Sequence, residues 1–413
     1  MMKTSVLNVA MRLPLWVAGL AIAGSAHSAT KSTLDLSAGV GASTNPQLQI
    51  GGRGSAFGRI SALGTHEWRS ERTTTSISLF GENTTYFKGY GSKQIFDLNA
   101  RSTHQVNSTW SIFGSVGFQG DFGGQLSNRF ATTTPDFTPV LDNQPPPSVI
   151  LDDPSFIGFG GRQYRLSGSV GVSIRASARS SVSLSGGAQR SFGTGIQRIG
   201  NYNSYFGNAS YDYKFSERTS AGLGVNLQYQ DYDNGSSSSV INPVVTARHQ
   251  FSDQIQGTAS VGVLLTRQSL IGGGSVHSVD PSFALGLCRT SARDRLCGRV
   301  SREARNSFGL GTIGRAGSLL TSTTAEVDYS RQLNANESIQ MAFSVSRYST
   351  TISGLDDVRT TYLTFLTGYD RKLGQRLAVG ANAGARRVLF AGRDPKTDYS
   401  GTVYLRYRLG DIK

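Results

Sequence analysis

The chain has 413 residues, of which 50 are glycine, 11 are proline and only 38% are hydrophobic, and its formal net charge is +14. After the first thirty residues no run places apolar side chains at the i, i+3, i+4 and i+7 spacing of an amphipathic helix, and no later segment has 18 consecutive apolar residues. These features exclude a helical globular protein and a bundle of membrane-spanning helices, and they predict strands and turns throughout.

Residues 1–28 have the organisation of a secretory signal peptide. Lys3 and Arg12 come before an apolar run over residues 13–23, and the small residues that follow at 24–28 offer acceptable cleavage sites. Because the apolar run is too short to cross a bilayer, we expect it to be removed on export, which leaves residues 29–413 as the mature protein. The alternative for this segment is a membrane anchor.

The mature sequence alternates apolar and polar residues with a period of two. Trp110, Ile112, Val116 and Phe118 share one parity, and mostly small or polar residues fill the other. This period is the signature of a strand with one apolar face. In chain order, the alternation runs through residues 34–40, 77–79, 96–100, 110–118, 164–174, 182–188, 209–215, 223–229, 245–251, 255–265, 283–287, 325–329, 339–345, 363–369, 377–385 and 403–409.

The connections between these segments alternate between short polar turns and long irregular loops. The long ones cover residues 43–54, 120–162, 193–201, 231–239, 267–280, 305–318, 349–357 and 388–398. Short turns on one side and long loops on the other are typical of an outer-membrane barrel. We therefore predict an all-β, single up-and-down antiparallel transmembrane β-barrel with short periplasmic turns and long extracellular loops. The count is about eighteen strands, with sixteen as the alternative because the first strand and residues 55–68 alternate weakly.

The partner of the apolar residues distinguishes a closed barrel from a sandwich of two sheets. The apolar parity needs a partner layer along every strand, and the sequence supplies no helices to cover it. Closing the sheet satisfies every strand edge and leaves lipid as the partner of the apolar face. The polar parity then lines a lumen, and we expect its arginines to attract anions: Arg101, Arg165, Arg175, Arg299, Arg386 and Arg406.

The two cysteines, Cys288 and Cys297, flank a short turn in CRTSARDRLC. In a tight hairpin they would lie directly opposite each other on the lumen parity, within disulfide range. Since an exported chain meets an oxidising compartment, we predict a disulfide, with two free thiols as the alternative.

The loop at 120–162 is the longest and differs in character from the others. It contains a run of three prolines at 145–147 and several acidic residues: Asp121, Asp136, Asp142, Asp152 and Asp153. An acidic loop above a basic wall suggests a segment that folds inward to constrict or gate the lumen. An exposed extracellular flap is the equal alternative.

Few residues point to catalysis or cofactor chemistry. His66, His104 and His249 fall on the lipid parity, and His277 lies in a loop, so no histidine is placed beside a nucleophile. Glycine-rich runs such as LIGGGS lack the strand-to-helix context of a phosphate-binding loop. We therefore predict no enzyme activity, no metal and no cofactor. Nucleic acid is not an expected partner, because an exported barrel rarely meets it.

The opening strand LDLSAGVGASTNPQL, the hairpin LCRTSARDRLCGRVSREAR and the following GLGTIG resemble the β-barrel porins found with bacterial exopolysaccharide gene clusters, the β-barrel porin 2 group. The resemblance implies an eighteen-stranded barrel in the outer membrane of a Gram-negative bacterium. It also implies a role in exopolysaccharide export beside a periplasmic polysaccharide export protein.

Three function classes follow from these observations. The first is a pore that assists export of an anionic exopolysaccharide, and the second is a general or solute-specific diffusion porin with anion preference. The third is a barrel enzyme or a structural outer-membrane protein. In each case the expected partners are outer-membrane lipid and, during biogenesis, the barrel assembly machinery. The sequence leaves open the sugar, the direction of transport and the oligomeric state.

Overall fold

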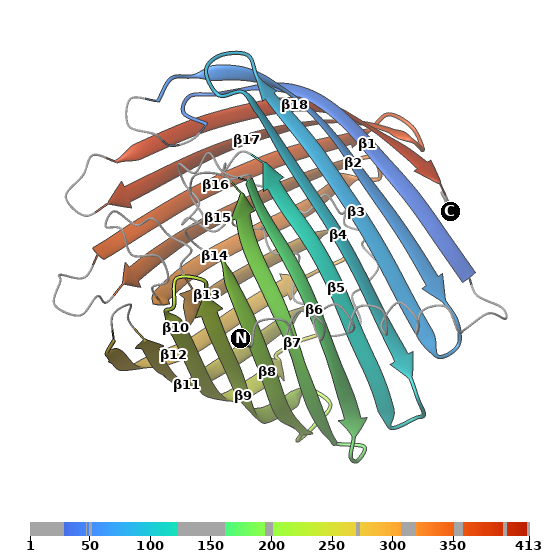
Figure 1. The fold of residues 1–413 in the computed structure, drawn as a ribbon. Coiled ribbons are helices and arrows are strands. Elements are labelled where there is room, and N and C mark those ends of the chain that lie inside the picture. Colours follow the sequence, from blue (N-terminus) through green and yellow to red (C-terminus); the bar gives the residue numbers. More distant parts are fainter. Residues whose placement is uncertain are drawn as a thin grey trace.

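The computed structural model describes residues 29–46, 48, 52–122, 162–194, 201–269, 273–306, 319–350, 358–390 and 395–410. These residues form eighteen antiparallel strands (Figure 1). In chain order the strands are β1 (Ala29–Ser43), β2 (Ser55–Arg69), β3 (Thr73–Tyr86), β4 (Ser92–Gln105), β5 (Trp110–Phe122), β6 (Arg162–Arg175), β7 (Ser180–Thr194), β8 (Tyr202–Lys214), β9 (Thr219–Tyr232), β10 (Ser237–Gln250), β11 (Ile255–Ser269), β12 (Ser275–Thr290), β13 (Asp294–Asn306), β14 (Leu319–Asn334), β15 (Glu337–Thr350), β16 (Val358–Lys372), β17 (Leu377–Phe390) and β18 (Lys396–Gly410). The prediction of eighteen strands is confirmed. The predicted signal peptide, residues 1–28, lies outside the described residues.

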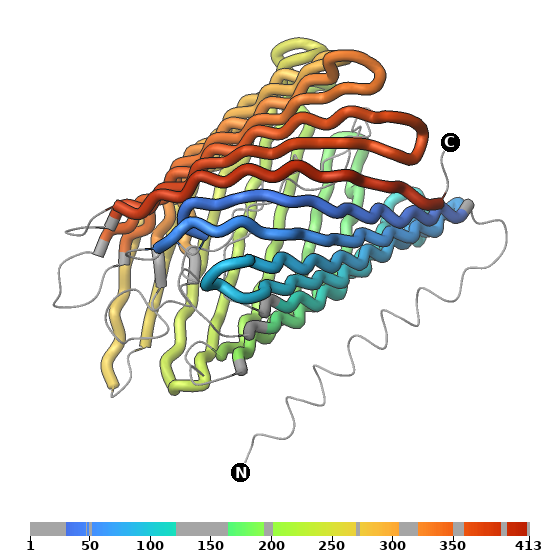
Figure 2. Tube along the Cα trace, turned by 90° about the horizontal axis from the view of Figure 1, so that it is seen from above, coloured from blue at the N-terminus to red at the C-terminus, as the bar shows by residue number. Residues whose placement is uncertain are grey.

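The sheet closes on itself through its first and last strands. Leu36 of β1 lies opposite Ala62 of β2 on one side and opposite Tyr407 of β18 on the other. Figure 2 shows this closure, with the first strand in blue directly beside the last strand in red. A closed barrel has no unpaired strand edge, so every strand can satisfy its main-chain groups within the sheet.

The residues at the apolar positions of the alternating pattern form the outer surface of the barrel. Large apolar side chains on this parity are exposed along nearly every strand, among them Leu36, Ile60, Leu98, Trp110 and Val261. The described residues contain no helix long and apolar enough to cross a membrane. The predicted partner of this outer face, membrane lipid, remains an expectation.

Aromatic side chains form a continuous row on the outer face of β4 to β7. The rings of Phe96 and Phe118 are 5.1 Å apart, Phe118 and Tyr164 stack at 6.3 Å, and Tyr164 and Phe192 stack at 5.2 Å. All four residues lie toward the long-loop ends of their strands. Aromatic rings at this height are typical of the interfacial girdles of transmembrane barrels.

Side-chain oxygen atoms fix the short turns. The side-chain oxygen of Asn107 accepts hydrogen bonds from the N–H groups of Thr109 and Trp110, both at 2.8 Å. The hydroxyl groups of Ser177, Ser252 and Ser291 accept hydrogen bonds from N–H groups two or three residues later. Local bonds of this kind specify tight turns, which is why these positions read as turns in the sequence.

A proline interrupts the ladder between β10 and β11. The N–H of Phe251 donates to the carbonyl oxygen of Ile255 at 2.9 Å. Because main-chain groups alternate in direction along a strand, every second residue of β10 counted back from Phe251 directs its N–H and C=O toward β11. Pro243 falls in this series and has no N–H to donate. The β10–β11 pairing accordingly skips Asn242 and Pro243 and resumes at Ile241.

A second proline ends the ladder between β12 and β13. The N–H of Ser291 donates to the carbonyl oxygen of Asp294 at 2.7 Å. By the same alternation, the residues of β12 whose main-chain groups point toward β13 are those at positions 289, 287, 285 and 283. Pro281 is next in the series and cannot donate. The ladder stops at Phe283 opposite Arg302 after eight pairs, the shortest of the eighteen strand pairings.

Candidate functional site

The lumen is the candidate functional site, and its walls carry the polar parity of the strands. All six arginines predicted to line it lie on this parity: Arg101, Arg165, Arg175, Arg299, Arg386 and Arg406. Their surroundings differ, because some of the guanidinium groups meet carboxylates on neighbouring strands. The six arginines therefore do not contribute equally to the charge that the lumen presents.

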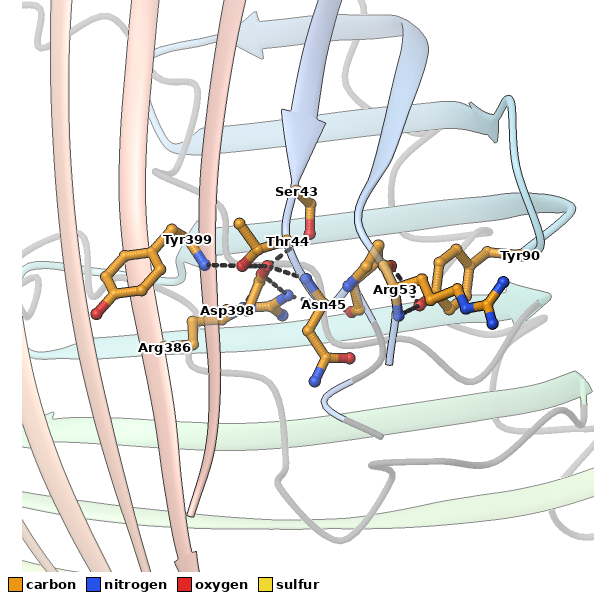
Figure 3. Close-up of polar contacts among 9 residues, drawn as sticks. Ser43, Thr44, Asn45, Arg53, Tyr90, Arg386, Asp398 and Tyr399 are labelled. Carbon is orange, nitrogen blue, oxygen red and sulfur yellow. Dashed lines mark hydrogen bonds and ion pairs between the residues drawn. The ribbon is translucent and has the colours of Figure 1, made fainter. Parts of the chain in front are cut away.

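Arg386 belongs to a buried cluster at the long-loop end of the barrel. Arg386 on β17 lies opposite Asp398 on β18, and its Nε and Nη2 both donate to Asp398 Oδ2, the longer bond being 3.2 Å. Asp398 Oδ1 accepts from the Ser43 hydroxyl at 2.6 Å and from the Asn45 N–H at 2.9 Å. The Asp398 side chain is fully buried. We call Ser43, Asn45, Arg386 and Asp398 the Asp398 cluster (Figure 3).

The Asp398 cluster holds the segment that follows β1 against the lumen wall. Arg386 Nη2 also donates to the carbonyl oxygen of Pro46 at 3.2 Å, and Leu48 is 1% exposed. Farther along the segment, the Tyr90 hydroxyl donates to the carbonyl of Arg53 at 2.6 Å (Figure 3). The Arg386 charge thus serves an internal structural role, which the sequence did not reveal.

Three further carboxylates on this side of the lumen contact arginines. Asp370 Oδ1 lies 3.4 Å from Arg406 Nη2, and Asp35 accepts two bonds from Arg408 at 2.7 and 2.8 Å. Glu82 lies 3.7 Å from Arg59 Nε. With the Asp398 cluster, these pairs occupy the lumen face of β16 to β18 and β1 to β3, which we call the paired wall.

The other four predicted arginines lie outside the paired wall. Arg299 is directly opposite Glu326 in the β13–β14 ladder. Arg101 on β4 and Arg175 on β6 are exposed, and neither has a carboxylate partner among the described residues. Arg165 on β6 lies opposite Gln119 of β5. Within the described residues, β4 and β6 therefore each hold an exposed lumen arginine that no carboxylate contacts.

The lumen face of β7 to β10 carries hydroxyl and amide groups in place of charges. Among the described residues of these faces, Asp212, Lys214 and Arg248 lie at the short-turn ends, and the rest of the surface is uncharged. We call this surface the neutral wall, and its polar residues include Ser185, Gln189, Ser204, Asn208, Asn226, Gln228 and Asn242.

One exposed aromatic side chain interrupts the neutral wall, whose two other aromatic residues, Tyr202 and Tyr232, are buried. Phe206 on β8 is opposite Gly187 of β7 and Gln228 of β9, both on the lumen parity, and 38% of it is exposed. Sequence reasoning missed this residue because it followed the apolar parity of the strand. The signal was present, since Phe206 is an aromatic residue on the polar parity.

The predicted disulfide is present in the structure. Cys288 and Cys297 are bonded, lie directly opposite each other in the β12–β13 ladder, and have Cα atoms 4.1 Å apart. This separation is that of a cross-strand pair without mutual main-chain hydrogen bonds, the geometry that favours a disulfide between adjacent strands.

The predicted gate lies largely outside the described residues. Asp136, Asp142, Asp152 and Asp153 belong to this undescribed part of the chain, and Asp121 lies at the end of β5, opposite Ile95 of β4. The inward folding of residues 120–162 therefore stays a prediction. The contacts that the structure does show over the lumen come from a different segment, the one that follows β1.

The described histidines make structural contacts. His66, His104 and His249 each use Nδ1 to hydrogen-bond a Ser or Thr hydroxyl on an adjacent strand, at 2.6 to 2.8 Å. Within the described ranges no group of three or more His, Cys, Asp or Glu side chains is arranged to hold a metal ion.

Comparison with known proteins finds similarity at the level of fold. No protein-family model and no curated protein matches the sequence. Among solved structures, the chain is similar to the outer-membrane porin OccK2 (OpdF) of Pseudomonas aeruginosa, with 12% identity over 93% of this chain and 98% of that one, and a TM-score of 0.47. It is also similar to the FrpB iron transporter of Neisseria meningitidis and the ferric citrate transporter FecA, with 9% and 10% identity over 87% and 89% of this chain, both at a TM-score of 0.46. The chain spans 62% and 63% of the lengths of these two transporters.

Proposed function

We propose that the protein is an outer-membrane pore that assists the export of an exopolysaccharide carrying negative charge. The supporting observation is the division of the lumen: the neutral wall offers amides and hydroxyls, and the adjacent strands β4 to β6 offer Arg101 and Arg175 without carboxylate partners. A sugar polymer needs many weak polar contacts to slide past, and its acidic groups favour a positive wall. A periplasmic polysaccharide export protein would deliver the polymer to the short-turn end.

A second candidate is a general or solute-specific diffusion porin with anion preference. The segment held by the Asp398 cluster supports it, because Asn45, Pro46 and Leu48 are buried against the lumen wall and reduce the space at the long-loop end. A narrowed mouth suits small solutes better than a polymer.

A gene deletion separates the two candidates. Loss of the protein should strongly reduce surface and secreted acidic polysaccharide if it is an export pore, and complementation should restore it. Purified protein in planar bilayers should conduct ions with preference for chloride over potassium. Unchanged polysaccharide in the deletion strain, together with ion conductance in bilayers, would leave the diffusion porin. A purified, folded barrel that carries no current would contradict both.

A further inference from the structure

The neutral wall presents one exposed aromatic ring within an uncharged polar surface. We propose that Phe206 is a stacking platform for a sugar ring, and that the amides beside it complete a carbohydrate subsite in the lumen. This proposal rests on the proposed pore function and deepens it, because it states which chemical feature of the polymer the wall binds: the apolar face and hydroxyl groups of a pyranose ring.

Contacts with the neighbouring strand determine how the Phe206 ring lies. A Cβ atom built on Gly187 would be 2.4 Å from Cζ of Phe206 and 2.9 Å from its Cε2. The ring therefore leans across the wall and over the main chain of β7, in space that only glycine leaves open. Because 38% of Phe206 is exposed, part of its ring is open to the lumen, and the C–H groups of a sugar ring can pack against an aromatic face.

A row of amides that starts beside Phe206 with Asn208 and continues through Asn226 to Asn242 of β10 offers hydrogen bonds of the kind that sugar hydroxyls need. The Asn208 amide nitrogen donates to the Asn226 oxygen, and the Asn242 oxygen accepts from the Ser282 hydroxyl at 2.8 Å. These bonds leave the Asn208 oxygen and the amide nitrogens of Asn226 and Asn242 with remaining capacity. A hydroxyl both donates and accepts, so it can bond either type of group.

The same surface is poorly suited to other classes of ligand. A purely apolar solute would cover the amides without bonding them, which costs the desolvation of each polar group. A small ion would find no opposite charge near Phe206, because the described charged residues of these lumen faces lie at the short-turn ends. Arg101 lies on the same ladder row, four strands from Phe206 or about 19 Å along the wall, where it could meet an acidic group elsewhere on the polymer.

Current blockade by oligosaccharides in planar bilayers tests the subsite. We would use the full mature protein with three hexasaccharides: maltohexaose, cellohexaose and an oligogalacturonate. At least one should block the wild-type current reversibly. The variants Phe206→Ala and Phe206→Leu should weaken that blockade about fivefold, because Leu keeps the apolar bulk and loses the flat aromatic face.

Tyr205 provides a matched control on the adjacent position of β8. It is 40% exposed, nearly the same as Phe206, and it points to the outer face. Tyr205→Ala should leave the blockade unchanged, and heat-modifiability on gels should show that all variants fold. Wild-type current that no sugar blocks, or equal blockade of Phe206→Ala and wild type, would overturn the subsite and leave the pore intact. Absence of any wild-type current would instead overturn the proposed function.

Discussion

The paired wall and the neutral wall lie in one lumen and are built on the same strand period, yet they use polar residues differently. In the paired wall, arginines on β17, β18 and β2 contact carboxylates, and Arg386 holds the segment after β1 in place. In the neutral wall, amides bond one another or a serine hydroxyl and still have capacity for a solute. A basic composition alone is therefore a poor guide to anion binding, since part of the positive charge is neutralised within the wall.

Removing the carboxylate at the centre of the Asp398 cluster should have the largest effect. Asp398→Ala leaves the Arg386 side chain, 11% exposed, without its counter-charge, and breaking a buried pair in this way costs about 3–5 kcal/mol. We expect a lower urea midpoint for unfolding in lipid vesicles and a higher single-channel conductance, because Asn45 and Pro46 lose their anchor.

The double variant Asp398→Ala with Arg386→Met serves as the control for this experiment. It removes both charges, so it should recover much of the lost stability while the conductance stays high. Equal stability of Asp398→Ala and wild type would show that the cluster does not hold the paired wall together.

A charge placed on the outer face tests whether the two walls have been assigned to the correct side. Val261 on β11 is 59% exposed, near the middle of its strand, and Val261→Arg should cost roughly 2–4 kcal/mol in the membrane. Its neighbour Ser260 faces the lumen, so Ser260→Arg should assemble normally and change the conductance. If both variants assemble equally well in heat-modifiability gels, the parity assignment is wrong.

The disulfide lies on the arc between the two walls and should have a smaller effect. Because the closed loop is short, Cys288→Ser with Cys297→Ser should lower the free energy of unfolding by no more than about 2.5 kcal/mol. A thiol reagent should label the native protein only after reduction. Full labelling without reductant would contradict the bond.

Neutralising the lumen arginines should have the smallest energetic effect and the most specific one. Arg101→Gln with Arg175→Gln should reduce the chloride-to-potassium permeability ratio roughly two- to fivefold, as expected for exposed charges that salt partly screens. Arg347→Gln with Arg387→Gln removes two exposed arginines from the outer face and should leave the ratio unchanged. A similar loss of selectivity in both double variants would show that β4 to β6 are not the selective surface.

The sequence predicted the features that depend on local order. Strand parity, the strand count and the Cys288–Cys297 bridge all follow from a period of two and from short turns that fix the register of a hairpin. The charge pairs were beyond its reach for a geometric reason. Residues 388–398 read as an irregular loop in the sequence, although β17 extends to Phe390 and β18 begins at Lys396, so the pairing of Arg386 with Asp398 could not be predicted. Asp35 meets Arg408 only because the barrel closes between β1 and β18. Phe206 could have been noticed from its parity, but its position over Gly187 requires the alignment of two strands.

Pro281 in β12 also makes the pairing of β12 with β13 the mechanically weakest one in the barrel wall. Beyond Phe283, β12 and β13 share no ladder pairs, and the contact between them is the ion pair of Arg302 with Asp280 at 3.2 Å, while each strand stays paired with its other neighbour, β11 or β14. Lateral tension on the barrel wall would separate β12 from β13 first, starting at the long-loop end and proceeding toward the short turn. The Cys288–Cys297 bond joins the same two strands nearer the short turn and would stop their separation there. The strand pair with the fewest ladder pairs is thus the one that a disulfide bond joins.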